Sequence, residues 1–455
     1  MSQTSGLRLL SVPREALAAR LAVVRAARET LDLQYYIWHR DSSGLGLLDA
    51  VRAAADRGVR VRLLLDDNGI RGLDRVLAVI DAHPRIDVRL FNPFPHRHHR
   101  WLDLLLHFTQ VNRRMHNKSL TADRSVTIVG GRNVGDEYFG THPAVDFADL
   151  DALAAGEAAA RVAEVFEQFW NSPLAVPLAS CEPAPTADDV DTVTRALREA
   201  ARTATAANDL ATLTSDTVDD VPVEVMADAP TKADTDATND SPGGVSDQLA
   251  AAFGAARREL DLVSSYFVPG SIGTAALTSL AQRDVRVRIV TNSLATSDVA
   301  AVHAGYARHR AALLRAGVQL FELKRGAAGP VGHGSGPVWM PARTGSTASL
   351  HGKTFVVDRE RLFVGSFNLD PRSVWLNTEM GLLIDSAPMA SAFSSSLDRD
   401  LDDVAYEVRL DGAGHLQWID HQPTGDVVFH RDPHAGWWLR AGVTALSWLP
   451  IDWLL

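Results

Sequence analysis

Apolar and polar positions follow helical and strand periods in turn along the first part of the chain. Residues 13–28 place apolar side chains at helical spacing, and residues 31–38 change to a strand pattern. Residues 46–57 are again helical and end before Gly58, a residue typical of a helix C-cap, and residues 59–65 form an apolar run expected of a buried strand. The pattern predicts units in which helices and strands alternate.

The same order returns in the second part of the chain. Residues 247–258 and 273–282 have helical spacing, and each is followed by a strand-like run, at 260–267 and 285–291. This alternation predicts α/β units with largely parallel sheets. The sequence itself also recurs, since VRVRL at 59–63 is repeated as VRVRI in the second half. We therefore expect two copies of one fold and not a solenoid of short repeats.

Paired strands interrupt this alternation once in each half. Residues 119–121 and 126–129 are rich in strand formers and flank a short polar turn, and residues 350–357 and 361–365 do the same. Mixed sheets are therefore expected. Helices should flank these sheets in both copies.

The composition shifts divide the chain into four parts. We predict a first domain over residues 1–175, a linker with a helical patch and an acidic loop over 176–245, a second domain over 246–400 and a C-terminal region over 401–455. A Gly/Ser/Pro-rich stretch at 326–349 precedes the second pair of strands. It either forms part of a site wall or is a tolerated insertion.

Composition narrows the class of protein. The chain has 455 residues, of which 46% are apolar and 22% charged, as in soluble proteins with two ordinary domains. Its net charge of −11 argues against broad electrostatic binding to nucleic acid. The single cysteine, Cys181, excludes an intrachain disulfide and a cluster of thiolate ligands. The first residues do not follow the pattern of a secretory signal peptide.

The end of the chain is unusually rich in tryptophan. Residues 437–455 read WWLRAGVTALSWLPIDWLL, which approaches spanning length but is interrupted by Arg440, Pro450 and Asp452. Tryptophan at both ends suits the headgroup layer of a membrane. The segment either packs on the core of its domain or binds at a membrane interface.

Two octapeptides carry the same candidate chemistry. Residues 116–123 read HNKSLTAD and residues 351–358 read HGKTFVVD, so both have the form H-x-K-x-x-x-x-D. Ten residues after each Asp comes an asparagine, Asn133 or Asn368. Chance matches at so many positions in both halves are improbable. We therefore expect a duplicated half-site whose copies meet over one substrate, with these candidate catalytic residues: His116, Lys118, Asp123, His351, Lys353 and Asp358.

The histidine and lysine of each motif should point the same way. Residues i and i+2 of a strand share a face, so His116 lies beside Lys118, and His351 beside Lys353. An imidazole next to an ammonium group suits an anionic, phosphate-like group.

The asparagines and the aspartates of the motifs are expected to differ in role. Asn133 and Asn368 end the returning strands, where their amides could donate to phosphoryl oxygens. Asp123 and Asp358 lie seven residues beyond the histidines, about 23 Å along an extended strand. Although they belong to the motif, we interpret both as turn or scaffold residues.

Two histidines at one phosphodiester suggest that one attacks phosphorus while the other protonates the departing alcohol. This scheme needs no metal and no cofactor, because two lysines and two asparagines can neutralise the developing charge. A carboxylate should hold the nucleophilic histidine in one tautomer, and Asp149 and Glu379, on strand-like segments after the motifs, are the candidates. The alternative for both is a surface or helix-capping carboxylate.

A basic run lies upstream of the first motif. Residues 96–100 read HRHHR, and Arg113 and Arg114 follow. This run either steers anionic lipid towards the site or is a solvated loop.

Several phrases around the motifs resemble the phospholipase D superfamily, and within it the bacterial cardiolipin synthase branch. They are LDLQYYIW at 31–38, NRRMHNK at 112–118, GGRNVGDEYF at 130–139, GSFNLDPRS at 365–373 and LNTEMG at 376–381. The closing Ser447-Trp448-Leu449-Pro450 is similar to subgroup C of that branch.

The resemblance implies two similar α/β domains that face each other, with the active site at their interface. It implies ping-pong phosphatidyl transfer through a phosphohistidine, with His116 as nucleophile and His351 as general acid. The acceptor would be phosphatidylglycerol, and subgroup C is associated with phosphatidylethanolamine as donor. The expected partners are therefore these phospholipids and the membrane surface, without nucleic acid or an obligate protein partner.

Two departures from the family pattern bear on substrate and membrane binding. Ser366 stands where the first half has Gly131, so only the second half offers a hydroxyl to the substrate phosphate. The N-terminal membrane helices of some cardiolipin synthases are missing, so we expect a peripheral enzyme on the cytoplasmic face of a bacterial membrane. Its membrane attachment would then depend on the C-terminal tryptophan-rich segment.

Three other functions remain open. A phospholipase D-like hydrolase would release phosphatidic acid, because water would resolve the same intermediate. A nuclease could use the same fold, but the acidic net charge and apolar tail argue against it. A lipid-binding protein with a dead site would not need both motifs intact.

Overall fold

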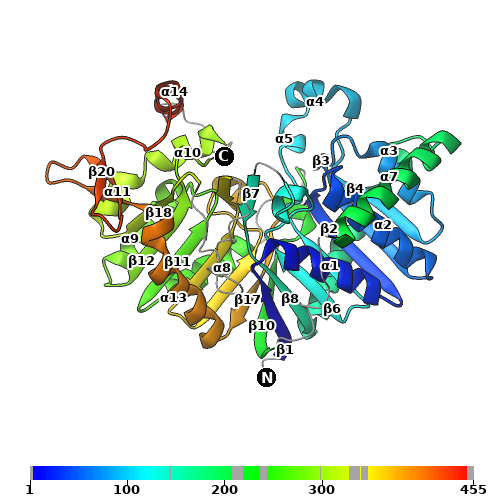
Figure 1. Ribbon diagram of the computed structural model, residues 1–455, viewed down its shortest axis with the longest axis horizontal. Coiled ribbons are helices and arrows are strands. Elements are labelled where there is room, and N and C mark those ends of the chain that lie inside the picture. The colour runs from blue at the N-terminus through cyan, green and yellow to red at the C-terminus, as the bar shows by residue number, and fades with distance from the viewer. Residues whose placement is uncertain are drawn as a thin grey trace. The chain divides into compact units, whose positions relative to one another are not determined.

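The computed structural model describes residues 4–142, 145–206, 219–235, 243–297, 299–326, 339 and 347–447. The chain forms two compact units (Figure 1). Unit 1 comprises Met1–His142, Asp151–Val245 and Leu376–Leu382, and unit 2 comprises Pro143–Leu150, Ser246–Trp375 and Leu383–Leu455. Each half of the sequence therefore builds most of one unit and contributes one short segment to the other.

Unit 1 contains a mixed sheet with helices packed against it. Its strands pair in the order β9-β4-β3-β2-β5-β6-β8-β1-β10, and the three strands β2, β3 and β4 run parallel. The strands are β1 (Thr4–Leu10), β2 (Thr30–Ile37), β3 (Arg60–Gly69), β4 (Ile86–Phe91), β5 (Ser119–Ala122), β6 (Val126–Gly130), β8 (Asp151–Gly156), β9 (Ala175–Pro177) and β10 (Asp219–Ala227). The helices are α1 (Pro13–Ala26), α2 (Ser42–Asp56), α3 (Asp74–Asp81), α4 (Arg100–Leu106), α5 (Phe108–Val111), α6 (Glu157–Trp170) and α7 (Ala187–Ala206).

Unit 2 repeats this plan. Its main sheet has the order β20-β19-β18-β13-β12-β11-β15-β16, again with three parallel strands, β11, β12 and β13. The strands are β7 (Val145–Ala148), β11 (Glu259–Ser264), β12 (Arg286–Asn292), β13 (Gln319–Leu323), β14 (Thr347–Leu350), β15 (Lys353–Val357), β16 (Arg361–Gly365), β18 (Ala405–Leu410), β19 (Leu416–Asp420) and β20 (Val427–Phe429). Strand β17 (Met380–Asp385) begins in the unit 1 segment Leu376–Leu382 and ends in unit 2. The helices are α8 (Val245–Gly254), α9 (Gly270–Ala281), α10 (Ala300–Ala307), α11 (Arg310–Arg315), α12 (Pro371–Trp375), α13 (Ala387–Val404) and α14 (Trp437–Ser447).

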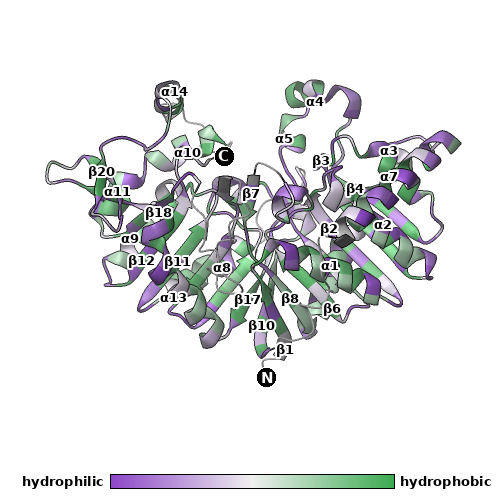
Figure 2. Ribbon diagram, in the orientation of Figure 1, coloured by the Kyte–Doolittle hydropathy of each residue, from purple (hydrophilic) through white to green (hydrophobic). Residues whose placement is uncertain are grey.

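The predicted fold class is confirmed, because both halves form mixed sheets flanked by helices. The helical patterns at 13–28 and 46–57 correspond to α1 and α2, and the strand patterns between and after them to β2 and β3. Figure 2 shows the physical basis, since apolar residues concentrate on the strands and on the helix faces turned towards them. The alternating helical and strand patterns in the sequence therefore mark the helices and strands that build the core.

Two sequence expectations differ from the structure. The run at 350–357 is not one strand, because β14 ends at Leu350 and pairs with β7, while β15 joins the main sheet from Lys353. The expected linker at 176–245 contributes to unit 1 in its described part, where α7 packs on α2 and β10 pairs with β1. Residues 236–242, within the expected acidic loop, and residues 327–338 and 340–346 of the Gly/Ser/Pro-rich stretch lie outside the described residues.

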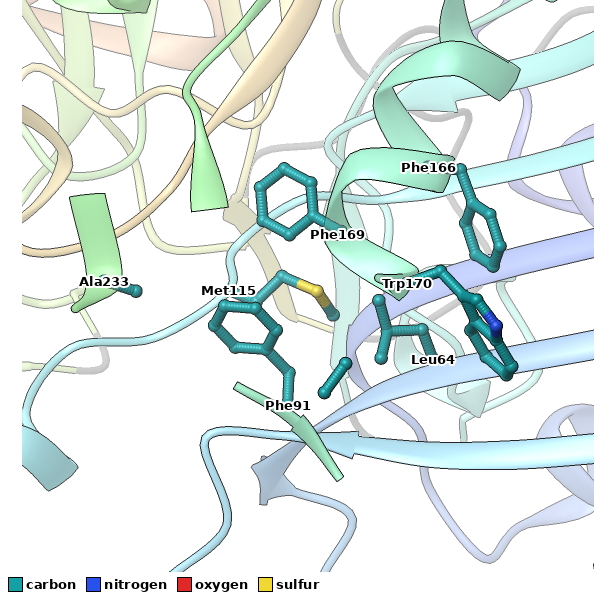
Figure 3. Packing of buried hydrophobic residues seen from close by; sticks show 8 residues of the cluster. Leu64, Phe91, Met115, Phe166, Phe169, Trp170 and Ala233 are labelled. Carbon is teal, nitrogen blue, oxygen red and sulfur yellow. The ribbon is translucent and has the colours of Figure 1, made fainter. Parts of the chain in front are cut away.

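One cluster of buried residues in unit 1 lies directly beside the first motif. Met115, the residue before His116, packs among large apolar side chains from β3, β4 and α6 (Figure 3). The cluster consists of Leu64, Phe91, Met115, Phe166, Phe169, Trp170, Ala175 and Ala233. The core of the unit therefore fixes the backbone from which His116 projects.

The aspartate of each motif organises a hairpin turn. Asp123 and Arg124 both have positive φ, 52° and 54°, as do Asp358 and Arg359 at 54° and 56°. Aspartate tolerates this left-handed region better than most residues. The Asp123 carboxylate also accepts hydrogen bonds from the backbone N–H groups of residues 28, 29 and 30, at 3.0, 2.8 and 2.9 Å. The hairpin is thereby tied to the start of β2.

Asp358 does the same in unit 2. Its carboxylate accepts from the backbone N–H groups of residues 257, 258 and 259 at 3.0, 2.7 and 3.0 Å. Burial raises the pKa of each aspartate, but the backbone donors outweigh it, so both pKa values lie below their usual range. The two aspartates are scaffold residues in this structure.

Replacing Asp123 with alanine should lower the free energy of unfolding by about 1–2 kcal/mol, because three charge-assisted hydrogen bonds at a partly exposed site are lost. A carboxylate whose folded pKa is depressed stabilises the fold above its unfolded pKa of about 3.9, and this contribution disappears as the pH falls through the folded pKa. The difference between wild type and Asp123→Ala, measured by urea unfolding, should therefore be present at pH 7 and shrink below about pH 4.

Asp87→Ala is the matched control, since Asp87 is an exposed aspartate on β4. This control should change the free energy of unfolding by less than about 0.5 kcal/mol. Equal effects of the two substitutions at pH 7 would contradict the scaffold role of Asp123.

Candidate active site

The backbone at His116 is paired with a segment from the other half of the sequence. The His116 N–H donates to the Thr378 carbonyl at 2.9 Å, and the Thr378 N–H donates to the Arg114 carbonyl at 2.9 Å. Met115 and Thr378 form a parallel bridge. These bonds place residue 379 beside the first histidine, within unit 1.

Glu379 binds the ring of His116. The Glu379 Oε2 lies 2.8 Å from the His116 Nδ1, and the carboxylate is fully buried. An ionised carboxylate can only accept, so Nδ1 carries the proton of this hydrogen bond. In the neutral ring the lone pair is therefore on Nε2, the nitrogen that would attack or take up a proton.

A second carboxylate, that of Asp228, fixes the backbone of Glu379. The Asp228 Oδ2 accepts from the Glu379 N–H at 2.9 Å, and the Asp228 N–H donates to the Glu379 carbonyl at 2.9 Å. The Lys232 Nζ lies 2.7 Å from the Asp228 Oδ2. Burial raises the pKa of Asp228, and Lys232 opposes this rise. Sequence reasoning missed both residues, because they lie in a region that read as linker and loop.

The second histidine has the same arrangement within unit 2. Strand β7 pairs in parallel with β14, and the His351 N–H donates to the Ala148 carbonyl at 2.8 Å. The Asp149 Oδ2 then lies 2.6 Å from the His351 Nδ1, while its Oδ1 accepts from the Leu150 N–H at 2.8 Å. Asp149 is buried, so the second imidazole is also held through Nδ1 with Nε2 turned away from the carboxylate.

The carboxylates are exchanged between the halves. In the sequence, Asp149 follows the first motif and Glu379 the second, but each binds the histidine of the other motif. The residue types were predicted from the sequence, whereas this exchange was not. It depends on two strand pairings that no local pattern reveals.

The lysines are buried next to their histidines. The Lys118 Nζ donates to the His116 carbonyl and lies 5.5 Å from the Tyr36 ring centre. The Lys353 Nζ donates to the His351 carbonyl and to the Ser265 Oγ, the latter at 3.2 Å. Both side chains are about 1% exposed. An ammonium group held in this way places positive charge beside each imidazole.

An aromatic ring contacts each histidine, which sequence reasoning did not anticipate. The Tyr36 ring lies edge-on to His116 with centroids 5.0 Å apart, and the Phe147 ring lies 5.3 Å from His351. Tyr36 belongs to the strand phrase LDLQYYIW at 31–38, which was the signal in the sequence that could have drawn attention to it. Phe147 precedes the carboxylate residue by two positions. Such rings restrict the imidazoles to one orientation.

The predicted phosphate-binding residues have hydrogen-bond partners within their own units. The Asn133 Oδ1 accepts from the Ile37 N–H at 3.1 Å and its Nδ2 donates to the Tyr138 hydroxyl at 2.9 Å, so this amide is part of the packing of unit 1. The Asn368 Oδ1 accepts from the Ser265 hydroxyl at 3.1 Å. Ser366 is fully buried. Asp123 and Asp358 lie at the opposite ends of β5 and β15 from the histidines.

The basic run upstream of the first motif is largely engaged within unit 1. Arg97 pairs with Asp67, Asp74 and Glu182. Arg114 is buried and its guanidinium contacts Asp66 at 3.2 Å. These arginines therefore fix the backbone that leads to His116 and do not form a free cationic patch.

The tryptophan-rich tail packs on unit 2 over part of its described length. Val443 and Leu446 of α14 pack against Leu294 and Ala304, while Trp437 and Trp438 are exposed. Trp448 to Leu455 lie outside the described residues. None of the helices in the described ranges has the length and apolar character needed to cross a bilayer.

Known proteins are similar to this chain in sequence or in fold. A family model described as "Cardiolipin synthase, PLD-like domain" matches residues 21–170 and 249–401. Cardiolipin synthase C of Escherichia coli (strain K12) is 41% identical over 463 residues, covering 99% of this chain and 96% of that protein. Cardiolipin synthase A of Pseudomonas syringae pv. syringae (strain B728a) is 28% identical, covering 87% of this chain and 68% of that protein.

The solved structure of phosphatidylserine synthase from Haemophilus influenzae Rd KW20 has the same fold, with a TM-score of 0.64 at 12% identity, and covers 100% of this chain and 97% of that chain. These matches indicate the same family as the motif phrases and the repeated fold. The chain therefore belongs to the phospholipase D-like cardiolipin synthase family, and it is an enzyme of the phosphatidyltransferase type.

Proposed function

We propose that this protein transfers a phosphatidyl group to phosphatidylglycerol through a phosphohistidine formed on His116. The observation that carries the proposal is the repeated unit of histidine, buried lysine and buried carboxylate, with each imidazole held through Nδ1. Phosphatidylethanolamine is the proposed donor, in keeping with the likeness to a cardiolipin synthase C. The enzyme would act as a peripheral protein on the cytoplasmic face of a bacterial membrane.

In the first step the His116 Nε2 attacks the phosphorus of the donor. A P–N bond forms and the P–O bond to the donor alcohol breaks, while His351 in its protonated form gives its Nε2 proton to the departing oxygen. Glu379 stabilises the positive charge that develops on the His116 ring. The Lys118 and Lys353 ammonium groups favour the extra negative charge on the phosphoryl oxygens.

In the second step His351 acts as a base. It takes the proton from a free hydroxyl of phosphatidylglycerol, whose oxygen attacks the phosphohistidine. The P–N bond breaks, the new phosphodiester leaves, and His116 returns to its neutral form. Water in place of the lipid hydroxyl would give phosphatidic acid, so the balance between transfer and hydrolysis depends on which hydroxyl reaches the intermediate.

Lipid product analysis tests the proposed reaction. The purified protein, incubated with phosphatidylglycerol and phosphatidylethanolamine, should form cardiolipin and release ethanolamine, as measured by mass spectrometry. Phosphatidic acid as the sole product would contradict a transferase and favour a hydrolase. Cleavage of DNA or RNA without any lipid product would favour a nuclease.

Both histidines should be essential. His116→Ala and His351→Ala are each expected to lower kcat by more than about 10³-fold, because one removes the nucleophile and the other the proton donor. His83→Ala is a matched control, since His83 lies in the turn after α3 and should leave turnover within about twofold of wild type. Full turnover in either motif variant would contradict the mechanism.

Glu379→Gln tests the carboxylate that orients the proposed nucleophile. The amide has nearly the same shape, but it cannot hold the ring through a charged acceptor, so kcat should fall roughly 10²- to 10⁴-fold while KM changes little. The matched control is Glu137→Gln, which alters a second histidine–glutamate pair of unit 1, with 2.9 Å between the His39 Nδ1 and the Glu137 Oε1. Equal losses in the two variants would show that a general loss of packing, and not the orientation of His116, is responsible.

A further inference from the structure

Helix α4 of unit 1 has its polarity reversed relative to an ordinary surface helix. Its apolar residues Trp101, Leu104, Leu105 and Leu106 are 61%, 53%, 74% and 68% exposed. Its single acidic residue, Asp103, is fully buried. A helix that faces water does the opposite, so this surface is built for an apolar surrounding.

Bonds to the buried carboxylate fix this orientation. The Asp103 Oδ2 accepts from the His96 N–H at 2.8 Å, and its Oδ1 lies 2.7 Å from the His96 Nδ1. The His107 ring stacks near the His96 ring, with centroids 6.1 Å apart. Leu104 and Leu105 lie about 100° and 200° around the helix from Asp103, so an inward Asp103 turns both leucines outward. Rotating the helix to bury them would expose or break a satisfied carboxylate.

The base of the helix is anchored to the rest of unit 1. Arg97, which precedes the helix, lies 2.6 Å from the Asp74 carboxylate and 2.9 Å from that of Asp67. Arg100 donates to the Asp67 carbonyl at 2.9 Å and lies 4.7 Å from the Phe94 ring centre. These bonds therefore hold α4, with its apolar surface, in a fixed position on unit 1.

The segment that carries α4 exposes no carboxylate. Residues 94–114 contain one acidic residue, the buried Asp103, whereas Arg97 and Arg114 are already paired with carboxylates from elsewhere in unit 1. His98 and His99 are exposed beside the helix. An apolar ridge that contains a tryptophan, beside exposed imidazoles and without an exposed carboxylate in residues 94–114, suits the headgroup layer of a phospholipid bilayer.

We propose that α4 is a membrane-docking element, which inserts Trp101, Leu105 and Leu106 among the lipids of an anionic bilayer. This inference rests on the proposed function, because an enzyme that acts on phospholipids must reach them at a bilayer. The helix ends ten residues before His116. The connection is stiff, since the Asn92 side chain donates to the carbonyls of Gln110 and Arg113 at 2.9 and 2.8 Å. Docking at α4 would thus bring the first motif close to the lipid surface.

Binding to vesicles tests the proposal with the full-length protein. Vesicles of phosphatidylglycerol and phosphatidylethanolamine are sedimented with wild type, with Leu105→Gln/Leu106→Gln, and with Val190→Gln as a control. Val190 is a 40% exposed apolar residue on α7 of the same unit. The partition coefficient of the double variant into vesicles should fall by about tenfold or more, because two exposed leucines no longer enter the apolar layer. The control should bind like wild type.

Turnover in detergent micelles separates this inference from the proposed function. The double variant should keep wild-type turnover on micellar lipid and lose it on vesicles. No transfer by the wild type in either format would contradict the proposed function. Transfer by the wild type, with unchanged vesicle binding in the double variant, would overturn the docking role of α4 alone.

A fluorescent label gives an independent readout that does not depend on the double variant. Cys181 is the only cysteine, so Cys181→Ser/Leu105→Cys can be labelled at α4 with an environment-sensitive dye. Its emission should shift to shorter wavelength when vesicles are added, whereas a label at Val190→Cys in the same background should not shift. A second copy of the chain is the other candidate partner for this surface. Sedimentation velocity without lipid tests for such a dimer. A wild-type dimer that the double variant converts to monomer, with no shift on vesicles, would assign the ridge to self-association and refute the proposal.

Discussion

The site depends on one interaction that occurs twice, a hydrogen bond from a histidine Nδ1 to a buried carboxylate. The His116–Glu379 and His351–Asp149 pairs measure 2.8 and 2.6 Å. Each pair forms only because a short segment from one half of the sequence pairs with the backbone of the other half. A duplicated chain that uses each copy to orient the histidine of the other cannot lose either copy without disabling both imidazoles.

Burial strengthens this hydrogen bond, but a buried carboxylate also needs partners for all of its polar atoms. Glu379 is fully enclosed, and an enclosed carboxylate without partners would be costly. His116 binds the Glu379 carboxylate, and Asp228 binds the Glu379 backbone. Lys232 pairs with the Asp228 carboxylate and so compensates its charge. The apolar cluster around Met115 then fixes the backbone beneath His116. The histidine is thus positioned by polar bonds on one side and by core packing on the other.

Local patterns predicted the repeated elements because the same periodicity that buries a core also marks its strands and helices. They also identified the twin motifs and the residue types of both carboxylates. They could not predict the exchange of Asp149 and Glu379, since strand pairing between segments more than 200 residues apart leaves no local trace. The role of Asn133 stays a prediction, because the structure shows its amide bound to Tyr138 and to the backbone of Ile37 but holds no substrate phosphate. The reversed helix α4 escaped notice because its apolar residues look like core until Asp103 is seen to be buried.

The most direct test of the account is the chemical identity of the covalent intermediate. A phosphodiester donor with a good leaving group, reacted with the His351→Ala variant, should accumulate phosphoenzyme, because loss of the base slows the second step. After alkaline denaturation and proteolysis, ³¹P NMR and mass spectrometry should find phosphorus on Nε2 of His116, since Glu379 occupies Nδ1. Phosphorus on Nδ1 of His116, or on another residue, would contradict the central claim that the buried carboxylate directs the reactive nitrogen.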